Sequence, residues 1–158
     1  MARPTLLVTD FAGTTLRDDG TVVSAYRRVL SARDIPFSDA DLAARRGASK
    51  RAVFEDFAAR VERDPERDTV VGADDVPVGR PAPFLIYRAM MDLEVLDVAS
   101  VAVVGDTTLD LRSAANARAG WGIGVLSGAH DLSTLGAEAH THLLPSVTGL
   151  PALFGLHD

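Results

Sequence analysis

The chain of 158 residues contains no cysteine. It therefore cannot form a disulfide scaffold, a thiolate metal site or a cysteine nucleophile, so any metal would be bound by oxygen or imidazole ligands. The absence also fits a reducing compartment. No stretch approaches the roughly 18 apolar residues of a membrane span, and Met1 to Asp10 lacks the apolar core of a secretory signal. We therefore expect a cytoplasmic protein that does not enter a membrane.

An excess of basic residues is also missing. There are 16 Lys and Arg against 22 Asp and Glu, a formal net charge of -6. Binding to a phosphate backbone needs clustered positive charge, so nucleic acid is not an expected partner. The content of 47% hydrophobic and 24% charged residues, with 13 glycines, is typical of a folded globular protein, and the length fits one domain.

Short apolar runs alternate along the chain with helical patterns. Runs that stop at a turn residue are typical of buried strands. They lie at residues 5–9, 100–104 and 123–126, with shorter candidates at 69–71 and 141–144. Apolar residues spaced three to four apart predict helices at residues 22–32, 39–46, 52–63, 82–91 and 109–119. Because strands alternate with helices, we expect an α/β protein with a doubly wound parallel sheet.

The alternation breaks after the first strand. Residues 20 to 63 hold two or three helical segments and no convincing strand, a pattern that predicts an inserted helical cap. We therefore divide the chain into a core, residues 1–16 and 66–158, and a cap insertion, residues 17–65.

Carboxylates follow two of the predicted core strands. Asp10 ends the first, Asp106 ends the strand at residues 100–104, and Asp110 lies one helical turn beyond. Parallel strands bring their carboxyl ends to one edge of the sheet, where ligands bind. Oxygen ligands of this kind suit Mg²⁺, which commonly bridges protein carboxylates and a substrate phosphate. The sequence therefore predicts a magnesium site.

Gly13, Thr14 and Thr15 follow Asp10 directly. A glycine with two hydroxyl residues at a strand-to-helix turn offers backbone and side-chain donors to an anion, so this segment is a candidate phosphate cradle. The alternative is structural: aspartate before glycine is common in turns, and the two threonines can cap a helix.

Three segments together resemble the haloacid dehalogenase superfamily, in the same order and at strand ends. They are DFAGTT at residues 10–15, GRPAP at residues 79–83 and GDTTLD at residues 105–110. Most phosphatases of that superfamily carry a second aspartate two positions after the nucleophile, where this chain has Ala12. Alanine there, together with GRPAP, is similar to the phosphonatase-like branch. The resemblance implies a Rossmann-like core and hydrolysis of a small phosphonate or phosphate ester.

The resemblance also implies roles for particular residues. Asp10 would take the phosphoryl group as an aspartyl phosphate, and Arg80 would neutralise its charge. Lys50, in the segment GASK, resembles the cap lysine that forms a Schiff base with an aldehyde substrate. A protonated imine accepts the electron pair of the breaking C–P bond. Mg²⁺ would be held by Asp10, the backbone carbonyl of Ala12 and Asp106, with Asp110 orienting these ligands.

The chain departs from this family between the cap and residue 70. Family members have there a core strand ending in a phosphate-binding Ser or Thr, then a helix, whereas residues 57–70 pass through one charged turn. We therefore expect one core strand to be missing. Thr69 is no substitute, because it begins the next predicted strand. That strand could pair with residues 5–9 instead, or a second copy of the chain could cover the edge, which predicts a homodimer.

These departures leave other interpretations open. One is a degenerate, weak or inactive member that acts as a binding or regulatory partner, and another is an ordinary phosphatase without imine chemistry. His130, His140, His142 and His157 show no convincing metal-ligand spacing. The segment GAHD at residues 128–131 resembles the phosphonatase-like branch too, but no catalytic step is assigned to it.

Overall fold

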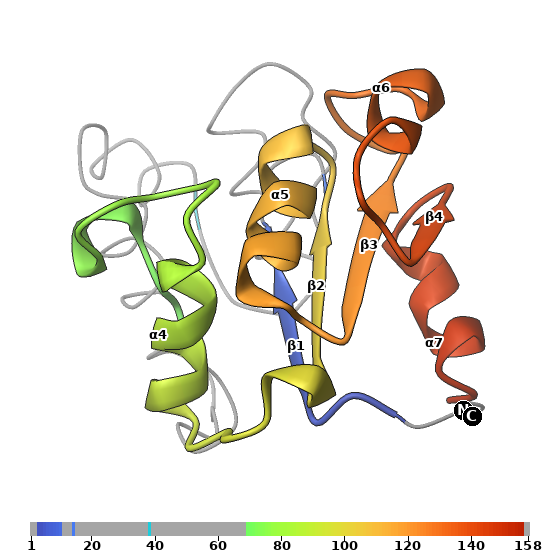
Figure 1. Cartoon of the computed structure of the whole chain (residues 1–158). Coiled ribbons are helices and arrows are strands. Elements are labelled where there is room, and N and C mark those ends of the chain that lie inside the picture. The colour runs from blue at the N-terminus through green and yellow to red at the C-terminus, as the bar shows by residue number, and fades with distance from the viewer. Residues whose placement is uncertain (1–2, 11–13, 15–37, 39–68, 157–158) are drawn as a thin grey trace.

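The computed structural model describes residues 3–10, 14, 38 and 69–156. They are drawn in colour in Figure 1. Apart from Ser38, the predicted cap lies outside the described residues, as do Lys50, Ala12, Gly13 and Thr15, so the expectations for them remain predictions.

The described core is built on a four-stranded parallel sheet. Its strands are β1 (Leu6–Thr9), β2 (Val101–Gly105), β3 (Trp121–Val125) and β4 (His142–Leu144). They lie in the order β1-β2-β3-β4, and every neighbouring pair is parallel. The α/β class with a parallel sheet is therefore confirmed.

Helices connect the strands and cover the sheet. Four α-helices are described: α4 (Phe84–Asp92), α5 (Thr108–Ala117), α6 (Leu132–Gly136) and α7 (Leu150–Leu153). Three short 3-10 turns accompany them: η1 (Ala73–Asp75), η2 (Val98–Ser100) and η3 (Val147–Gly149). The helices predicted at residues 82–91 and 109–119 are thus present as α4 and α5, whereas α6 and α7 were not predicted. Of the described helices, none is long and apolar enough to cross a membrane.

Alternate residues of β2 enter two separate parts of the core, as the pleat of a strand requires. Val101 and Val103 pack on one face with residues of α4 and α5; α5 lies in front of the strands in Figure 1. Ala102 and Val104 pack on the other face with Leu150 of α7. All five residues of β2 are buried, as expected for a central strand of a parallel sheet.

One predicted strand is absent. Residues 69–71 are described and form neither a strand nor a helix. They therefore do not pair with β1, and the rearrangement in which they replace the missing core strand is wrong. The apolar character of Val70 and Val71 is explained by partial burial, since both are half-buried. Two β-branched residues with no alternation beyond them are a weak strand signal, because burial alone produces the same pattern.

Candidate active site

The register of β1 against β2 brings two carboxylates to the same edge of the sheet. Thr9 pairs with Val104, and the ladder continues one step, because the amide of Asp10 donates to the carbonyl of Val104 at 2.9 Å. Asp10 and Asp106 therefore leave the carboxyl ends of adjacent parallel strands, the place where such sheets bind ligands.

Asp106 is almost completely buried, at 2% exposure, and its carboxylate is held from two loops. The hydroxyl of Thr14 donates to Oδ1 at 2.9 Å, and the amide of Ala129 donates to Oδ2 at 2.7 Å. A carboxylate has about four acceptor positions, so these two bonds fix its orientation and leave lone pairs for a further ligand. The role of Thr14 in a phosphate cradle stays a prediction; in this structure its hydroxyl donates to Asp106.

Asp110 is held by the start of its own helix. Both the amide and the hydroxyl of Thr107 donate to its Oδ2, at 3.0 and 2.6 Å. Thr107 is the N-cap residue of α5, and the carboxylate reaching back to that amide is half of a capping box. Thr107 was missed in the sequence, although its spacing of three residues from Asp110 is the signal of such a box.

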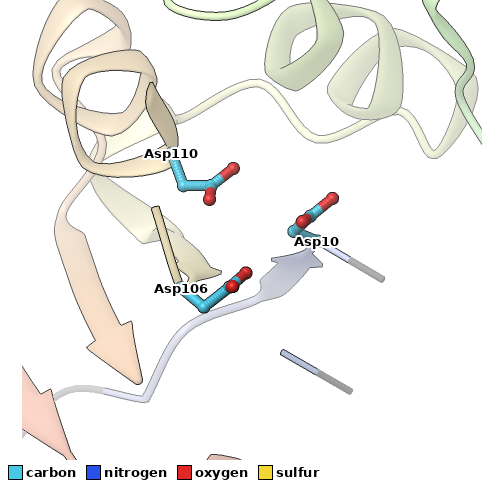
Figure 2. Close-up of side chains that lie close together, drawn as sticks. All are labelled: Asp10, Asp106 and Asp110. Atoms are coloured by element: carbon cyan, nitrogen blue, oxygen red, sulfur yellow. The ribbon is translucent and has the colours of Figure 1, made fainter. Parts of the chain in front are cut away.

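The carboxylates of Asp10, Asp106 and Asp110 form one cluster. One oxygen from each lies within 4.8 Å of the others. Figure 2 shows the three side chains gathered at the ends of β1 and β2 and the start of α5. All three predicted metal-site carboxylates are therefore brought together.

Arg80 joins this cluster from the loop before α4. Its Nη1 lies 3.2 Å from Oδ1 of Asp10 and also bonds Oδ1 of Asp110. Burial lowers the pKa of Arg80, but the bond and charge of Asp110 and the charge of Asp10 outweigh it and raise the pKa above its ordinary value. A permanent cation thus sits between two of the three carboxylates. The side-chain amide of Asn116 supports the loop, donating to the carbonyl of Pro81 at 2.8 Å.

The segment after β3 is bound to the site by hydrogen bonds. In addition to the Ala129 contact, the amide of His130 donates to the backbone carbonyl of Asp106 at 3.3 Å. Its imidazole Nδ1 accepts a hydrogen bond from the amide of Thr108 at 3.1 Å. The sequence signal for this segment was its family-like GAHD, which carried no assigned role. The other described histidines lie elsewhere, with His140 bonded to the carbonyl of Glu138.

The donor set of the cluster fits a small divalent cation. Its ligand atoms are all carboxylate oxygens, which Mg²⁺ prefers. Three carboxylates and one guanidinium leave a formal charge of -2, which a divalent cation balances. Asp106, with one hydrogen bond on each carboxylate oxygen, keeps acceptor positions for it. Asp110 has fewer, because Thr107 and Arg80 occupy most of its oxygen lone pairs.

The sequence is similar to known hydrolases over its second half. Residues 77–150 match the family model of HAD-hydrolase-like proteins. Over 71 residues, 45% of this chain, it is 46% identical to the phosphonoacetaldehyde hydrolase of Syntrophobacter fumaroxidans. Over 65 residues, 41% of this chain, it is 40% identical to that of Parabacteroides distasonis. The matched segments span only about a quarter of these relatives, 25% and 24% of their lengths.

Solved structures share the fold over nearly the whole chain. A protein from Bacteroides fragilis, described as a haloacid dehalogenase-like hydrolase, has a TM-score of 0.65 at 19% identity, covering 94% of this chain and 100% of that one. A hydrolase from Pseudomonas syringae has a TM-score of 0.61 at 18% identity, covering 98% and 100%. These likenesses show the fold, and the sequence matches over the second half confirm the resemblance that the motifs predicted.

Proposed function

We propose that this chain, a haloacid dehalogenase-like protein with the phosphonatase-like motifs, is a Mg²⁺-dependent hydrolase that cleaves a small phosphonate or phosphate ester. One observation carries the proposal. Asp10, Asp106 and Asp110 converge at the carboxyl ends of β1 and β2 with Arg80 between two of them. Clustered carboxylates with one cation provide both a nucleophile and a site for the charge of a transferring phosphoryl group.

Asp10 is the nucleophile in this proposal. Its side chain is 24% exposed, whereas that of Asp110 is 4% exposed, so Asp10 is the carboxylate that a substrate reaches more easily. An oxygen of Asp10 bonds to phosphorus while the bond from phosphorus to the leaving group breaks, giving an aspartyl phosphate. Water then attacks this phosphorus, releases inorganic phosphate and restores the carboxylate.

Arg80 supports this transfer through its charge. Its guanidinium is next to Asp10 and keeps its proton at any physiological pH, since its pKa is raised. Fixed positive charge beside the phosphoryl oxygens is the dominant help in phosphoryl transfer. The proton of Arg80 is never transferred, so its contribution is electrostatic and directional.

The cation would be held by Asp10, Asp106 and the backbone carbonyl of Ala12, with Asp110 orienting the site. When bound, Mg²⁺ supplies positive charge to phosphoryl oxygens. The protein residues hold the ligands in place. Thr14 and Ala129 fix Asp106, and Thr107 fixes Asp110.

For a phosphonate substrate, the proposal adds Lys50. Its free amine would condense with an aldehyde to an imine and release water. On C–P cleavage the protonated imine accepts the electron pair as an enamine, which is later hydrolysed to free the lysine. The support is the GASK segment and the similarity to relatives named phosphonoacetaldehyde hydrolase. Without Lys50 chemistry, the same core would act as a phosphatase on phosphate esters.

The test is phosphate release from phosphonoacetaldehyde and a panel of small phosphate monoesters, with and without Mg²⁺. We expect metal-dependent release that is lost in Asp10→Asn. Borohydride reduction in the presence of the aldehyde should add mass to Lys50; release without an adduct would eliminate the imine step and leave a phosphatase.

A second candidate function is a degenerate member that binds a phosphorylated ligand or a regulatory partner without turnover. Two sequence features favour it: Ala12 replaces the usual acid, and residues 57–70 lack the expected core strand that ends in a phosphate-binding Ser or Thr. It predicts no phosphate release from any compound and no change in phenotype for Asp10→Asn. We propose a cytoplasmic location and a homodimer for either function, and no nucleic-acid or membrane partner.

A further inference from the structure

The segment Gly128–His130 follows β3 and the turn after it. It contacts Asp106, just after β2, and the first turn of α5. Three of its hydrogen bonds reach them. The amide of Ala129 donates to Oδ2 of Asp106, the amide of His130 donates to the carbonyl of Asp106, and Nδ1 of His130 accepts from the amide of Thr108. The segment therefore ties the end of β2 to the first turn of α5, which carries Asp110.

Gly128 is required by the closeness of this contact. A Cβ atom at this position would lie 2.0 Å from Oδ2 and 2.4 Å from Cγ of Asp106. These distances are far below van der Waals contact, so any side chain would push the Asp106 carboxylate aside. Glycine is the residue that permits such a close backbone approach.

His130 completes the start of α5. Thr108 is the first residue of this helix, and its amide belongs to the group that has no partner within the helix. Nδ1 of His130 supplies the acceptor. Because Nδ1 accepts, it carries no proton, and the imidazole acts here as an acceptor at a fixed position.

We propose that Gly128, Ala129 and His130 are positioning residues that hold Asp106 and the first turn of α5 in the arrangement that binds a divalent cation. The inference rests on the proposed function, because it deepens the metal site of that function. Partners that orient metal ligands in this way typically account for about 10- to 100-fold in metal affinity.

The experiment measures Mn²⁺ binding by titration calorimetry and the rise in melting temperature on adding Mg²⁺, so it does not depend on turnover. Gly128→Ala displaces the Asp106 carboxylate, and His130→Ala removes the acceptor for Thr108. We expect each to weaken Mn²⁺ binding about 10- to 100-fold. His130→Asn places an amide oxygen where Nδ1 was, and we expect it to recover most of the affinity.

Control variants separate positioning from general damage. Gly136→Ala has nothing closer than Leu143 at 4.0 Å, and His140→Ala lies outside the site. Gly120→Ala collides with the carbonyl oxygen of Ala99 at 1.9 Å, before the start of β3, so it perturbs packing at the opposite end of the strand from Asp106. All three should bind Mn²⁺ as the unaltered chain does, and Gly120→Ala should do so while melting at a lower temperature.

The outcomes are distinguishable. Unchanged Mn²⁺ affinity in Gly128→Ala and His130→Ala would overturn the inference and leave the proposed function intact. If Gly128→Ala does not fold, the two His130 variants decide, because equal affinity in His130→Ala and His130→Asn would overturn the positioning role. Failure of the unaltered chain to bind Mn²⁺ would overturn both this inference and the metal-dependent part of the proposed function.

Discussion

At the scale of single residues, the site is organised by what each carboxylate accepts. Asp106 takes one hydrogen bond on each oxygen, whereas Asp110 takes two on Oδ2 and the guanidinium of Arg80 on Oδ1. Arg80 contacts Asp10 and Asp110, and of these two side chains that of Asp10 is the more exposed to solvent. The three residues are chemically identical, so their different tasks come from their neighbours.

The hydroxyl of Thr14 gives a direct test of this organisation. Thr14→Val keeps the shape of the side chain but deprives buried Oδ1 of Asp106 of its donor, which should cost about 1–3 kcal/mol of unfolding free energy. Thr14→Ser keeps the hydroxyl and loses one buried methyl group, about 0.8 kcal/mol. Urea denaturation in EDTA measures both. A Thr14→Val protein as stable as the unaltered chain would contradict the orienting role.

The carboxylates themselves could be identified from the sequence, because each follows a buried strand or lies one turn into the next helix. Their partners could not. Nothing in the sequence indicates that the Thr14 hydroxyl points to Asp106, since the hydrogen bond joins loops 92 residues apart. The same holds for Ala129, whose contribution is a backbone amide and leaves no trace in the residue type.

At the scale of elements, α5 connects the site to the core. Its first turn carries Asp110, and further along it packs against β2 and β3, where Gly122 of β3 lets Ala114 approach closely. Leu111 is 1% exposed on this inner side, whereas Leu109 is 40% exposed.

Two matched truncations test the packing of α5. Leu111→Ala should lower the free energy of unfolding by about 2–5 kcal/mol, because it leaves a cavity in a buried region. Leu109→Ala removes the same atoms from an exposed position and should change it by less than about 0.5 kcal/mol. Chemical denaturation of both variants provides the comparison, and similar losses would mean that α5 is not packed as described.

The capping residue of α6 gives a pH-dependent prediction. The backbone amide of Thr134 donates to Asp131, and this bond holds the pKa of that carboxyl below its ordinary value. A carboxyl whose pKa is lowered on folding stabilises the protein above its unfolded pKa and loses that contribution as the pH falls through its folded pKa. The stability difference between the unaltered chain and Asp131→Ala should therefore shrink on acidification below about pH 4. A difference independent of pH would contradict this.

Which elements could be predicted depended on their length and burial. β1, β2 and the second half of β3 were predicted from short apolar runs that stop at a turn residue: Leu6–Val8, Val101–Val104 and the run at residues 123–126. α6 and α7 have only five and four residues, too few for helical periodicity to register. Their signals were local: Asp131 as N-cap, and proline at the start of α7. The strand predicted at residues 69–71 was wrong, because Val70 and Val71 are apolar side chains that pack partly buried outside a strand.

At the scale of the whole molecule, one of the two predicted ways to cover the edge left by the missing strand remains: a second copy of the chain. Residues 69–71 do not replace that strand, and among the described residues β1 has β2 as its sheet neighbour. α4 packs beside β1 and exposes Phe84, Tyr87 and Met91. Their spacing of three and four residues places them on one side of the helix, so this side of α4 offers an apolar surface.

Light scattering of the 158-residue chain at micromolar concentration tests the proposed homodimer. We expect twice the 16.7 kDa of one chain. Met91→Glu puts a charge on the most exposed residue of the α4 surface, 70% exposed, and should shift the mass to that of a single chain. Leu132→Glu is the matched control, because this residue is 59% exposed but lies on α6, and it should leave the dimer intact. A single-chain mass for the unaltered protein would refute the dimer, whereas a dimer that survives Met91→Glu would place the contact on another surface.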